Sequence, residues 1–320
     1  MRMPRHLAVE FAFIAFSLAN AAVATAHVPM VKTQAPGYYR IVVGEFEVTA
    51  LSDGTALLPV ATDLIRTTPV EVNRYLARAF LADPVETSVN AFLVNTGSKL
   101  VLIDTGVGGY MGPDTGKLLV NLKAAGYQPE QIDEIFITHM HGDHIGGLAP
   151  QGTAAFPNAV VRASKLEAAY WLKPENLNAA SADAKGGFQH ARDSLDPYIK
   201  SGRFSAFDDG ATLVPGIRAI ATHGHTPGHT SYMIESNGEK MLVLGDLVHV
   251  GAVQLPKPSV AITYDSDSRA AVRQRQSVFH DAAQGGYWIA AAHLSFPGIG
   301  HLRTDGGGYV WIPANYAIPR

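Results

Sequence analysis

The sequence predicts an α/β domain in which two mixed β-sheets pack face to face and helices cover their outer faces. Short apolar or alternating runs recur along the chain, in the order strands, helices, strands, helix, strand. Polar segments rich in His and Asp directly follow several of these runs, as expected where strands end at one rim of a layered fold. No stretch resembles an interdomain linker, so residues 27–320 are expected to form one domain.

The expected strands are apolar runs bounded by polar or glycine-containing turns. A strand pair is expected at residues 40–51, ending in the turn Ser52-Asp53-Gly54. Further strands are expected at residues 90–95, 99–103, 134–137, 159–162, 217–221, 232–234, 240–244 and 287–292.

The expected helices have local start and stop signals. They are placed at residues 69–81, 117–125, 164–172, 188–200 and 269–283. Pro69 suits a first helical position, Gly126 follows the second helix, and Ser164 can cap the third. Residues 173–187 are rich in Pro, Asn, Ala and Gly, so a loop or lid is expected there.

The composition argues against several classes of function. Its 47% hydrophobic and 17% charged residues are typical of a globular protein with a sizeable core. The formal net charge of −3 and the lack of a dense Lys/Arg run argue against a nucleic-acid partner. The chain has no cysteine, so any metal must be held by His, Asp, Glu or water.

The N-terminus is typical of a cleavable secretory signal. Arg2, Arg5 and His6 precede an apolar stretch at residues 11–23, which ends in Ala24-Thr25-Ala26. The apolar part is too short to span a bilayer comfortably, and a buried N-terminal helix is the alternative. We expect cleavage near Ala26 and export to the periplasm or the medium.

The strongest functional signal is a cluster of polar residues at 138–144. His139, His141, Asp143 and His144 follow the apolar run at residues 135–137. Imidazole and carboxylate are ligands that zinc-like ions prefer, and four of them at one strand end can surround more than one ion. A His-rich solvated turn without metal is the alternative. Three later strand ends add His225, Asp246 and His293.

These motifs resemble those of the metallo-β-lactamase superfamily of αββα hydrolases. The pattern His-x-His-x-Asp-His, Gly-His-Thr-Pro-Gly-His, Gly-Asp and a late His occurs in order within residues 90–297. The resemblance implies one metal ion on His139, His141 and His225, a second on Asp143, His144 and His293, and Asp246 as the bridging ligand. Spacing alone cannot separate His225 from His223 and His229, and the choice follows the family motif.

Two further residues are expected to support the ligands. His229 is interpreted as a hydrogen-bonded histidine beside the metal site. Asp104, at the end of the strand at 99–103, is expected to orient a ligand histidine, as carboxylates behind metal ligands commonly do. The alternative for Asp104 is a simple Asp-Thr-Gly turn.

Outside the ligands, the sequence is similar to the exported group of this superfamily that contains methyl parathion hydrolase. The similar segments are residues 36–40, 51–54, 124–130, 223–229 and 293–301. Members hydrolyse organophosphate triesters, aryl esters or lactones, including dihydrocoumarin-type and acyl-homoserine lactones. The resemblance therefore implies two divalent ions, with Zn²⁺ expected, and a homodimer.

The main departure from that group is His249, three residues after Asp246. Acyl-homoserine lactonases place a tyrosine there, and the organophosphate hydrolase places an aliphatic residue. A neutral His249 could donate a hydrogen bond to a carbonyl oxygen or a leaving alkoxide, and a wall residue without a proton role is the alternative. Asp246 and His249 are the predicted catalytic residues. The predicted pocket residues are Met111, Trp171, Phe188, His249, Ile262 and Tyr264.

The expected function is hydrolysis of lactones or aryl esters by a hydroxide that bridges the two metals, with promiscuous activity on organophosphate triesters. A primary organophosphate hydrolase is the alternative. An amidohydrolase barrel would need eight strand–helix units, which the paired strands argue against. A β-lactamase, a nuclease and a zinc-binding protein without turnover fit the sequence less well.

Overall fold

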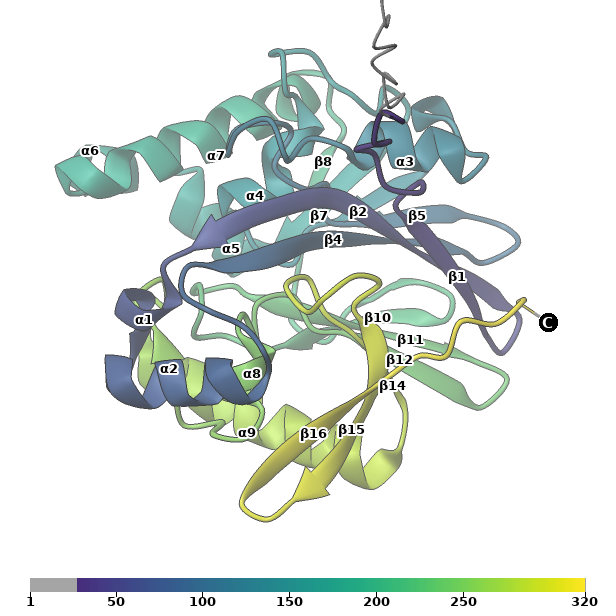
Figure 1. Ribbon diagram of the computed structural model, residues 1–320. Helices are drawn as coiled ribbons and strands as arrows, with labels where there is room; N and C mark the ends of the chain where they lie inside the picture. Colours follow the sequence, from purple (N-terminus) through teal and green to yellow (C-terminus); the bar gives the residue numbers. More distant parts are fainter. Residues whose placement is uncertain (1–27, 320) are drawn as a thin grey trace, which may run out of the picture. The chain divides into compact units, whose positions relative to one another are not determined.

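Two seven-stranded sheets form the centre of the computed structural model, which describes residues 28–319 (Figure 1). The first sheet has the order β1 (Tyr38–Val43), β2 (Phe46–Leu58), β4 (Val85–Asn95), β5 (Leu100–Ile103), β6 (Glu134–Phe136), β7 (Val160–Ser164), β8 (Phe204–Phe207). The second has the order β16 (Gly308–Pro313), β15 (Ile299–Asp305), β14 (Trp288–Ala290), β12 (Glu239–Val243), β11 (Thr230–Ser236), β10 (Ile217–Ala221), β9 (Thr212–Val214). A small third sheet pairs β3 (Leu64–Ile65) with β13 (Ala261–Ile262). These strands belong to one compact unit, Pro36–Arg320.

Both large sheets mix parallel and antiparallel pairs. In the first sheet, β1 to β5 pair antiparallel and β5 to β8 pair parallel. In the second, β12 and β14 are parallel and the other neighbours are antiparallel. The predicted α/β fold with two mixed sheets is confirmed. The predicted signal segment, residues 1–26, lies outside the described residues.

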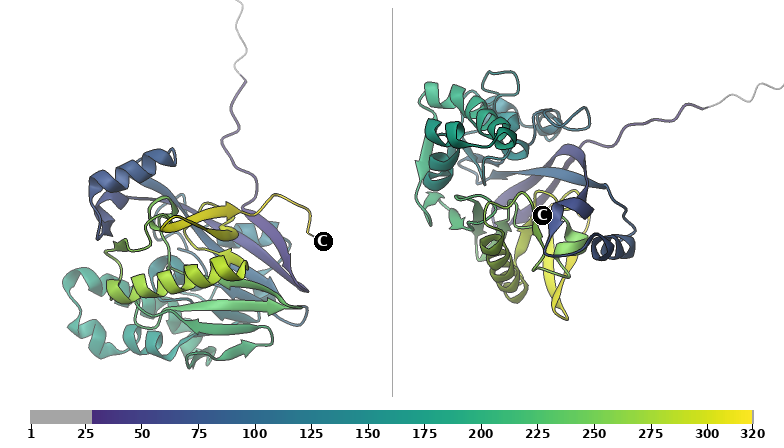
Figure 2. Two further views of the ribbon diagram at one scale, coloured as in Figure 1. Left: turned by 90° about the horizontal axis from the view of Figure 1, so that it is seen from below. Right: turned by 90° about the vertical axis from the view of Figure 1, so that its left-hand side faces the viewer.

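Three apolar layers hold the sandwich together. Between the sheets, Val94, Ile103 and Phe136 pack in one buried cluster with Ile234 and Val243. Burying each such side chain contributes about 1.5–3 kcal/mol. A second cluster joins the outer face of the first sheet to its helices, and a third joins the second sheet to a single long helix. Figure 2 shows that long helix, α9 (Ser268–Gly285), lying against the second sheet.

The remaining helices lie on the first sheet or beside the sandwich (Figure 1). On the side of the first sheet lie α3 (Leu118–Ala124), α4 (Gly142–Ile145), α5 (Lys165–Trp171), α6 (Pro174–Ala179) and α7 (Ala182–Lys200), with short 3₁₀ turns at Pro129–Gln131 and Gly146–Leu148. Beside the sandwich lie α1 (Val60–Asp63), α2 (Pro69–Arg78) and α8 (Gly251–Gln254). Among the described residues, no helix combines the length and apolar character needed to cross a membrane.

Two local predictions were wrong. The expected turn at residues 52–54 is part of β2, where the register shifts between Ser52 and Gly54 and forms a bulge. The carboxylate of Asp53 lies buried there and accepts hydrogen bonds from three backbone N–H groups, so the polar residue needs no solvent-exposed turn.

Residues 173–187 are largely helical rather than a loop. Pro174 occupies the start of α6, and Ser181 caps α7 by accepting a hydrogen bond from Ala184 N. The glycine pair at 186–187 lies inside α7, because the rest of that 19-residue helix packs its apolar side on the core. The Ser181 cap and the packing of α7 on the core offset the low helix propensity of these two glycines.

The site is positioned by strands that point the same way. β10 and β12 both run antiparallel to β11, and β14 runs parallel to β12, so the carboxyl ends of all three lie at one edge of the second sheet. In the first sheet, β5 and β6 are parallel, and the segments that follow them also lie side by side. Loops from both sheets therefore meet at one rim of the sandwich.

Candidate metal centre

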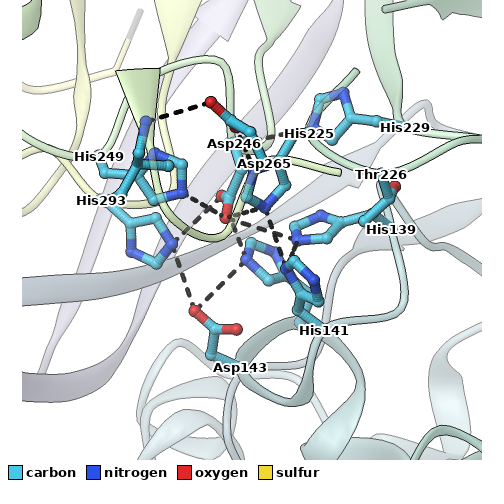
Figure 3. A network of polar contacts seen from close by, with 12 residues as sticks. His139, His141, Asp143, His225, Thr226, His229, Asp246, His249, Asp265 and His293 are labelled. Atoms are coloured by element: carbon cyan, nitrogen blue, oxygen red, sulfur yellow. Dashed lines mark hydrogen bonds and ion pairs between the residues drawn. The ribbon is translucent and has the colours of Figure 1, made fainter. Parts of the chain in front are cut away.

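All seven predicted ligands lie together at this rim, in two groups that share Asp246. His139, His141, Asp143 and His144 follow β6, while His225, Asp246 and His293 follow β10, β12 and β14. In each group, one ligand atom from every member lies within 4.8 Å of the others. Figure 3 shows side chains from both sheets pointing toward a common centre.

The first group consists of His139, His141, His225 and Asp246. Nδ1 of His141 lies 3.0 Å from Nε2 of His139 and 3.0 Å from Nε2 of His225. Oδ2 of Asp246 lies 3.4 Å from the same His139 atom and 3.2 Å from the same His225 atom. Three imidazole nitrogens and one carboxylate oxygen thus face one point.

The second group consists of Asp143, His144, Asp246 and His293. Here Asp246 contributes its other oxygen, because Oδ1 lies 3.2 Å from Nε2 of His144 and 3.2 Å from Nε2 of His293. Oδ2 of Asp143 lies 3.5 Å from the His144 atom and 3.3 Å from the His293 atom. The two oxygens of one carboxylate therefore serve two different groups.

The donor set fits two divalent ions. Nε2 of His144 and Oδ1 of Asp246 are buried and have no hydrogen-bond partner among the described residues. Buried polar atoms are normally paired, so these two atoms need another partner. Neutral imidazole nitrogens and carboxylate oxygens are ligands for zinc-like ions, and four converging ligand atoms match the tetrahedral coordination of Zn²⁺.

The charges of the site also favour divalent metal ions. Burial opposes the ionised form of Asp246, but the surrounding histidines outweigh it and hold the pKa of Asp246 well below its usual range. Burial also lowers the pKa of His225, but hydrogen bonds to Asp246 and Asp265 outweigh this effect and raise the pKa to about 9. Without a metal ion, protons shared among the histidines balance the carboxylates, and divalent ions can replace them.

Groups behind the ligands fix their orientation. Asp104 accepts from Nδ1 of His144 at 2.9 Å and from both N and Oγ1 of Thr138, so the predicted supporting carboxylate contacts a ligand. His293 donates from Nδ1 to the carbonyl of Ser88 at 3.0 Å. Each contact places the proton on Nδ1 and leaves Nε2 free to face the site.

His229, which we expected beside the site, holds the backbone of the bridging ligand. Its Nε2 accepts a hydrogen bond from Asp246 N at 2.9 Å, and its Nδ1 lies 2.9 Å from Oγ1 of Thr222. Burial, with repulsion from His225, lowers the pKa of His229 to about 3, so the ring is neutral and can accept that bond. His223 lies away from the metal groups, 3.3 Å from Asp209.

The structure places His249 against the bridging carboxylate. Its Nε2 lies 3.0 Å from Oδ2 of Asp246, and its ring stacks on that of His293 at 5.4 Å. Its Nδ1 is buried and has no hydrogen-bond partner within residues 28–319. When Nε2 donates to Asp246, the neutral ring offers Nδ1 as an acceptor rather than as a donor.

The other predicted pocket residues lie in different surroundings. Trp171 packs edge-on against His141 at 5.5 Å between ring centroids, and Phe188 packs on Trp171 at 4.7 Å. Tyr264 lies 6.2 Å from the ring of His249. Ile262 is fully buried in an apolar cluster, whereas Met111 is 44% exposed.

A cavity of about 600 Å³ lies beside the metal groups. His249 and His293 line one part of it, together with Ser88 and Leu294. His249 is the one predicted pocket residue among those that line it. The cavity therefore extends from the His249–His293 stack toward α2 and β16.

Two buried carboxylates near the site were not predicted. Asp265 accepts from Nδ1 of His225 at 2.9 Å, and Glu167 accepts hydrogen bonds from both ligand-bearing loops. Neither directly follows an apolar run, and neither belongs to a ligand motif. The Asp-rich segment at 265–267 and the single acid in the apolar helix α5 are the only signals that the sequence offered.

Comparison with known proteins identifies the family. Residues 84–280 match the family model of the metallo-beta-lactamase superfamily. The chain belongs to this superfamily. An N-acyl homoserine lactonase from Bacillus cereus is 25% identical over 130 residues, which are 40% of this chain and 43% of that protein. Another, from a Bacillus species, is 31% identical over 118 residues, which are 36% of this chain and 38% of that protein. The chain thus spans less than half of these superfamily relatives.

Two solved structures match over a longer range. One, described as hydrolase AbOPH in beta lactamase superfamily, has a TM-score of 0.85 and 39% identity, covering 89% of this chain and 100% of that one. AidC, described as a dizinc quorum-quenching lactonase in complex with a product, has a TM-score of 0.77 and 29% identity, covering 88% and 99%. The resemblance to the superfamily inferred from the ligand motifs is confirmed.

Proposed function

We propose that this protein is a hydrolase that holds two divalent ions, with Zn²⁺ expected, and opens lactones or cleaves aryl esters. The proposal rests on Asp246, because one of its carboxylate oxygens faces the first ligand group and the other oxygen faces the second. The lactone substrate class is supported by AidC and by the N-acyl homoserine lactonases among its relatives. Dihydrocoumarin-like and acyl-homoserine lactones are the expected substrates.

Bound at these groups, two divalent ions supply Lewis acidity and a nucleophile at neutral pH. The residues of the chain hold the ligands in place. Asp246 fixes the spacing between the two ligand groups. Asp104 and Asp265 accept from Nδ1 of His144 and His225, so that Nε2 of each ring faces the site. His249 contacts Asp246 through Nε2, and this N–H is the proton that His249 would give to a leaving oxygen.

Substrate is expected to approach past the ligands that remain partly exposed. His141 and Asp143 are half-buried, whereas the other ligands are buried. The ring of Trp171 borders His141 and provides an apolar wall on this side. Ligand pockets commonly combine such apolar walls with a few polar groups. An apolar acyl or aryl substituent fits this wall.

A paired rate measurement tests the function. The purified chain, loaded with zinc, would be assayed with dihydrocoumarin, N-hexanoyl homoserine lactone and methyl parathion, and its zinc content determined in parallel. We expect about two zinc ions per chain, as two-metal sites require, and a larger kcat/KM for the lactones. Dominant turnover of methyl parathion would instead support an organophosphate hydrolase, and fewer than two ions would contradict the paired site. Asp246→Asn, which removes the shared carboxylate, is the inactive control.

We further propose that the chain is exported and that it forms a homodimer. Mass spectrometry of protein secreted by a bacterial host would show whether cleavage occurs after Ala26. Light scattering of the purified protein would show whether the chain forms the expected homodimer.

A further inference from the structure

Glu167, in the first turn of α5, is a fully buried carboxylate surrounded by hydrogen-bond donors. Its Oε1 accepts from Met140 N at 2.8 Å and from Trp171 Nε1 at 2.7 Å. Its Oε2 accepts from Thr226 Oγ1 at 2.7 Å and from Gly228 N at 2.9 Å. A buried charge is costly unless it is fully hydrogen-bonded, and these four donors meet that requirement.

The four donors connect this carboxylate to both loops of the first metal group. Met140 lies between His139 and His141, and Thr226 directly follows His225. All three histidines of the first group are thus adjacent to residues that donate to Glu167. The two loops come from different sheets, and the two oxygens of one side chain join them.

The packing around Glu167 leaves little freedom. A Cβ at Gly228 would lie 2.1 Å from Glu167 N, so only glycine allows the second loop to approach α5 this closely. Trp171, one turn along α5, donates to the carboxylate and packs edge-on against the ring of His141. The same carboxylate therefore also orients a side chain that contacts a metal ligand.

The second metal group is held by other residues. His144 is oriented by Asp104, and His293 follows β14 and donates to the carbonyl of Ser88. Neither contact involves Glu167. The two groups therefore depend on different supporting residues, although they share Asp246.

We propose that Glu167 is a positioning residue that sets the metal affinity of the group formed by His139, His141 and His225. This inference rests on the proposed two-ion function. The carboxylate fixes the distance between the two loops, so the three nitrogens are already in place before a metal ion arrives. Preorganised ligands bind more tightly because less conformational freedom is lost on binding.

The conservative variant Glu167→Gln should expose this role. Three of the four donors are N–H groups that cannot accept a hydrogen bond. The amide of Gln can offer its oxygen to only one of the two pairs. Its NH₂ group is best placed toward Thr226, whose hydroxyl can turn to accept, which leaves Gly228 N without a partner. The loop that carries His225 then loses its fixed position.

The two metal groups can be measured separately in variants that each keep one group. His293→Ala removes a ligand of the second group, and His225→Ala removes a ligand of the first. Zinc would be titrated into each metal-free chain against a chromophoric chelator, with and without Glu167→Gln. Circular dichroism melting of the metal-free chains would report folding independently. Comparing the two variants shows how much Glu167 contributes to the zinc affinity of each group.

We expect Glu167→Gln to weaken zinc binding by about 10–100-fold in the His293→Ala background, as for other residues that orient metal ligands. In the His225→Ala background the change should be much less than tenfold. Equal weakening in both backgrounds, or none in either, would overturn the inference. A wild-type chain that binds two zinc ions without lactone turnover would contradict the proposed substrate and leave this inference standing.

Two further variants keep the proposal testable if Glu167→Gln does not fold. Thr226→Val removes one donor at nearly constant volume, so zinc binding by the first group should weaken while the second is unchanged. Unchanged binding by the first group in this variant would overturn the inference. Trp171→Phe is the matched control, because it removes a donor that lies on α5 itself and not on a ligand loop. It should change KM for lactones more than it changes zinc affinity.

Discussion

Asp265 holds His225 through a hydrogen bond of 2.9 Å between Oδ1 and Nδ1, and its side chain has no exposed surface. The second oxygen of Asp265 accepts from Ile262 N at 3.2 Å, so the carboxylate is itself fixed by the backbone. The proton therefore lies on Nδ1 of His225, and Nε2 faces Asp246 and His141. Such a carboxylate orients the ring and raises the basicity of the ligand nitrogen.

Asp265→Asn should weaken zinc binding about 10-fold or more, because a neutral amide cannot support His225 as the carboxylate does. The measurement is a zinc titration of the metal-free variant against a chelator. Asp208→Asn is the control, since that carboxylate is exposed and pairs only with Lys165. Zinc affinity equal to that of the wild type would show that the contact has no role in metal binding.

His249→Leu tests the predicted proton role. We expect kcat/KM for N-hexanoyl homoserine lactone, whose leaving group is an alkoxide, to fall by about 100-fold, within the range for loss of a general acid or base. Turnover of methyl parathion should change far less, because a nitrophenolate leaves without a proton. Zinc content must be measured in the same samples, since His249 also contacts Asp246. Unchanged lactone turnover would make His249 a wall residue only.

The location of the metal ligands could be predicted because each follows a recognisable strand, whereas the choice of His225 over His223 and His229 came from the family motif. His139 to His144 follow one apolar run, and His225, Asp246 and His293 follow three others. A strand has a clear sequence pattern, and its carboxyl end shows approximately where the ligands that follow it lie. Four such ends at one rim bring the ligands together without any knowledge of the sheet order.

The supporting residues could not be predicted in this way. Asp265 contacts a residue 40 positions away, and Glu167 contacts Thr226 across 59 positions. Such contacts depend on how α5 and the segment before α9 pack, which no local pattern encodes. Residues 173–187 were misassigned for a related reason: the short helix α6 and the first turns of the 19-residue helix α7 form there despite a composition typical of loops.

Arg275→Met should destabilise the fold. The guanidinium is fully buried in α9 and donates to the carbonyls of Leu247, Pro258 and Val260, which brace the segment that carries His249. Unpaired buried carbonyls cost about 1–3 kcal/mol each, so the free energy of unfolding should fall by about 3 kcal/mol or more. Urea denaturation of the metal-free protein measures it. Arg273→Met, on the exposed side of the same helix, is the control, and its free energy of unfolding should stay within about 0.5 kcal/mol of the wild-type value. A similar loss of stability in both variants would contradict a specific role for Arg275.

Metal uptake should release protons at neutral pH. Burial lowers the pKa of His293, but Asp246 and Asp143 outweigh this effect and raise the pKa to about 10 in the metal-free site. The pKa of His225 is raised to about 9, against the effect of burial, by Asp246 and Asp265. At pH 7 both rings therefore carry a proton that a metal ion must displace from Nε2.

The sign of the pH dependence follows from these raised pKa values. Zinc affinity should increase as the pH rises toward about 9 for His225 and about 10 for His293, and decrease as the pH falls. Conversely, the stabilisation that the protonated rings give to the metal-free fold is fully present below pH 6.5 and lost as the pH rises through these values. Isothermal titration calorimetry at pH 7, in two buffers with different ionisation enthalpies, measures the protons released. If the heat of zinc binding were the same in both buffers, the rings would already be unprotonated, and carboxylates alone would have to balance the charge of the site.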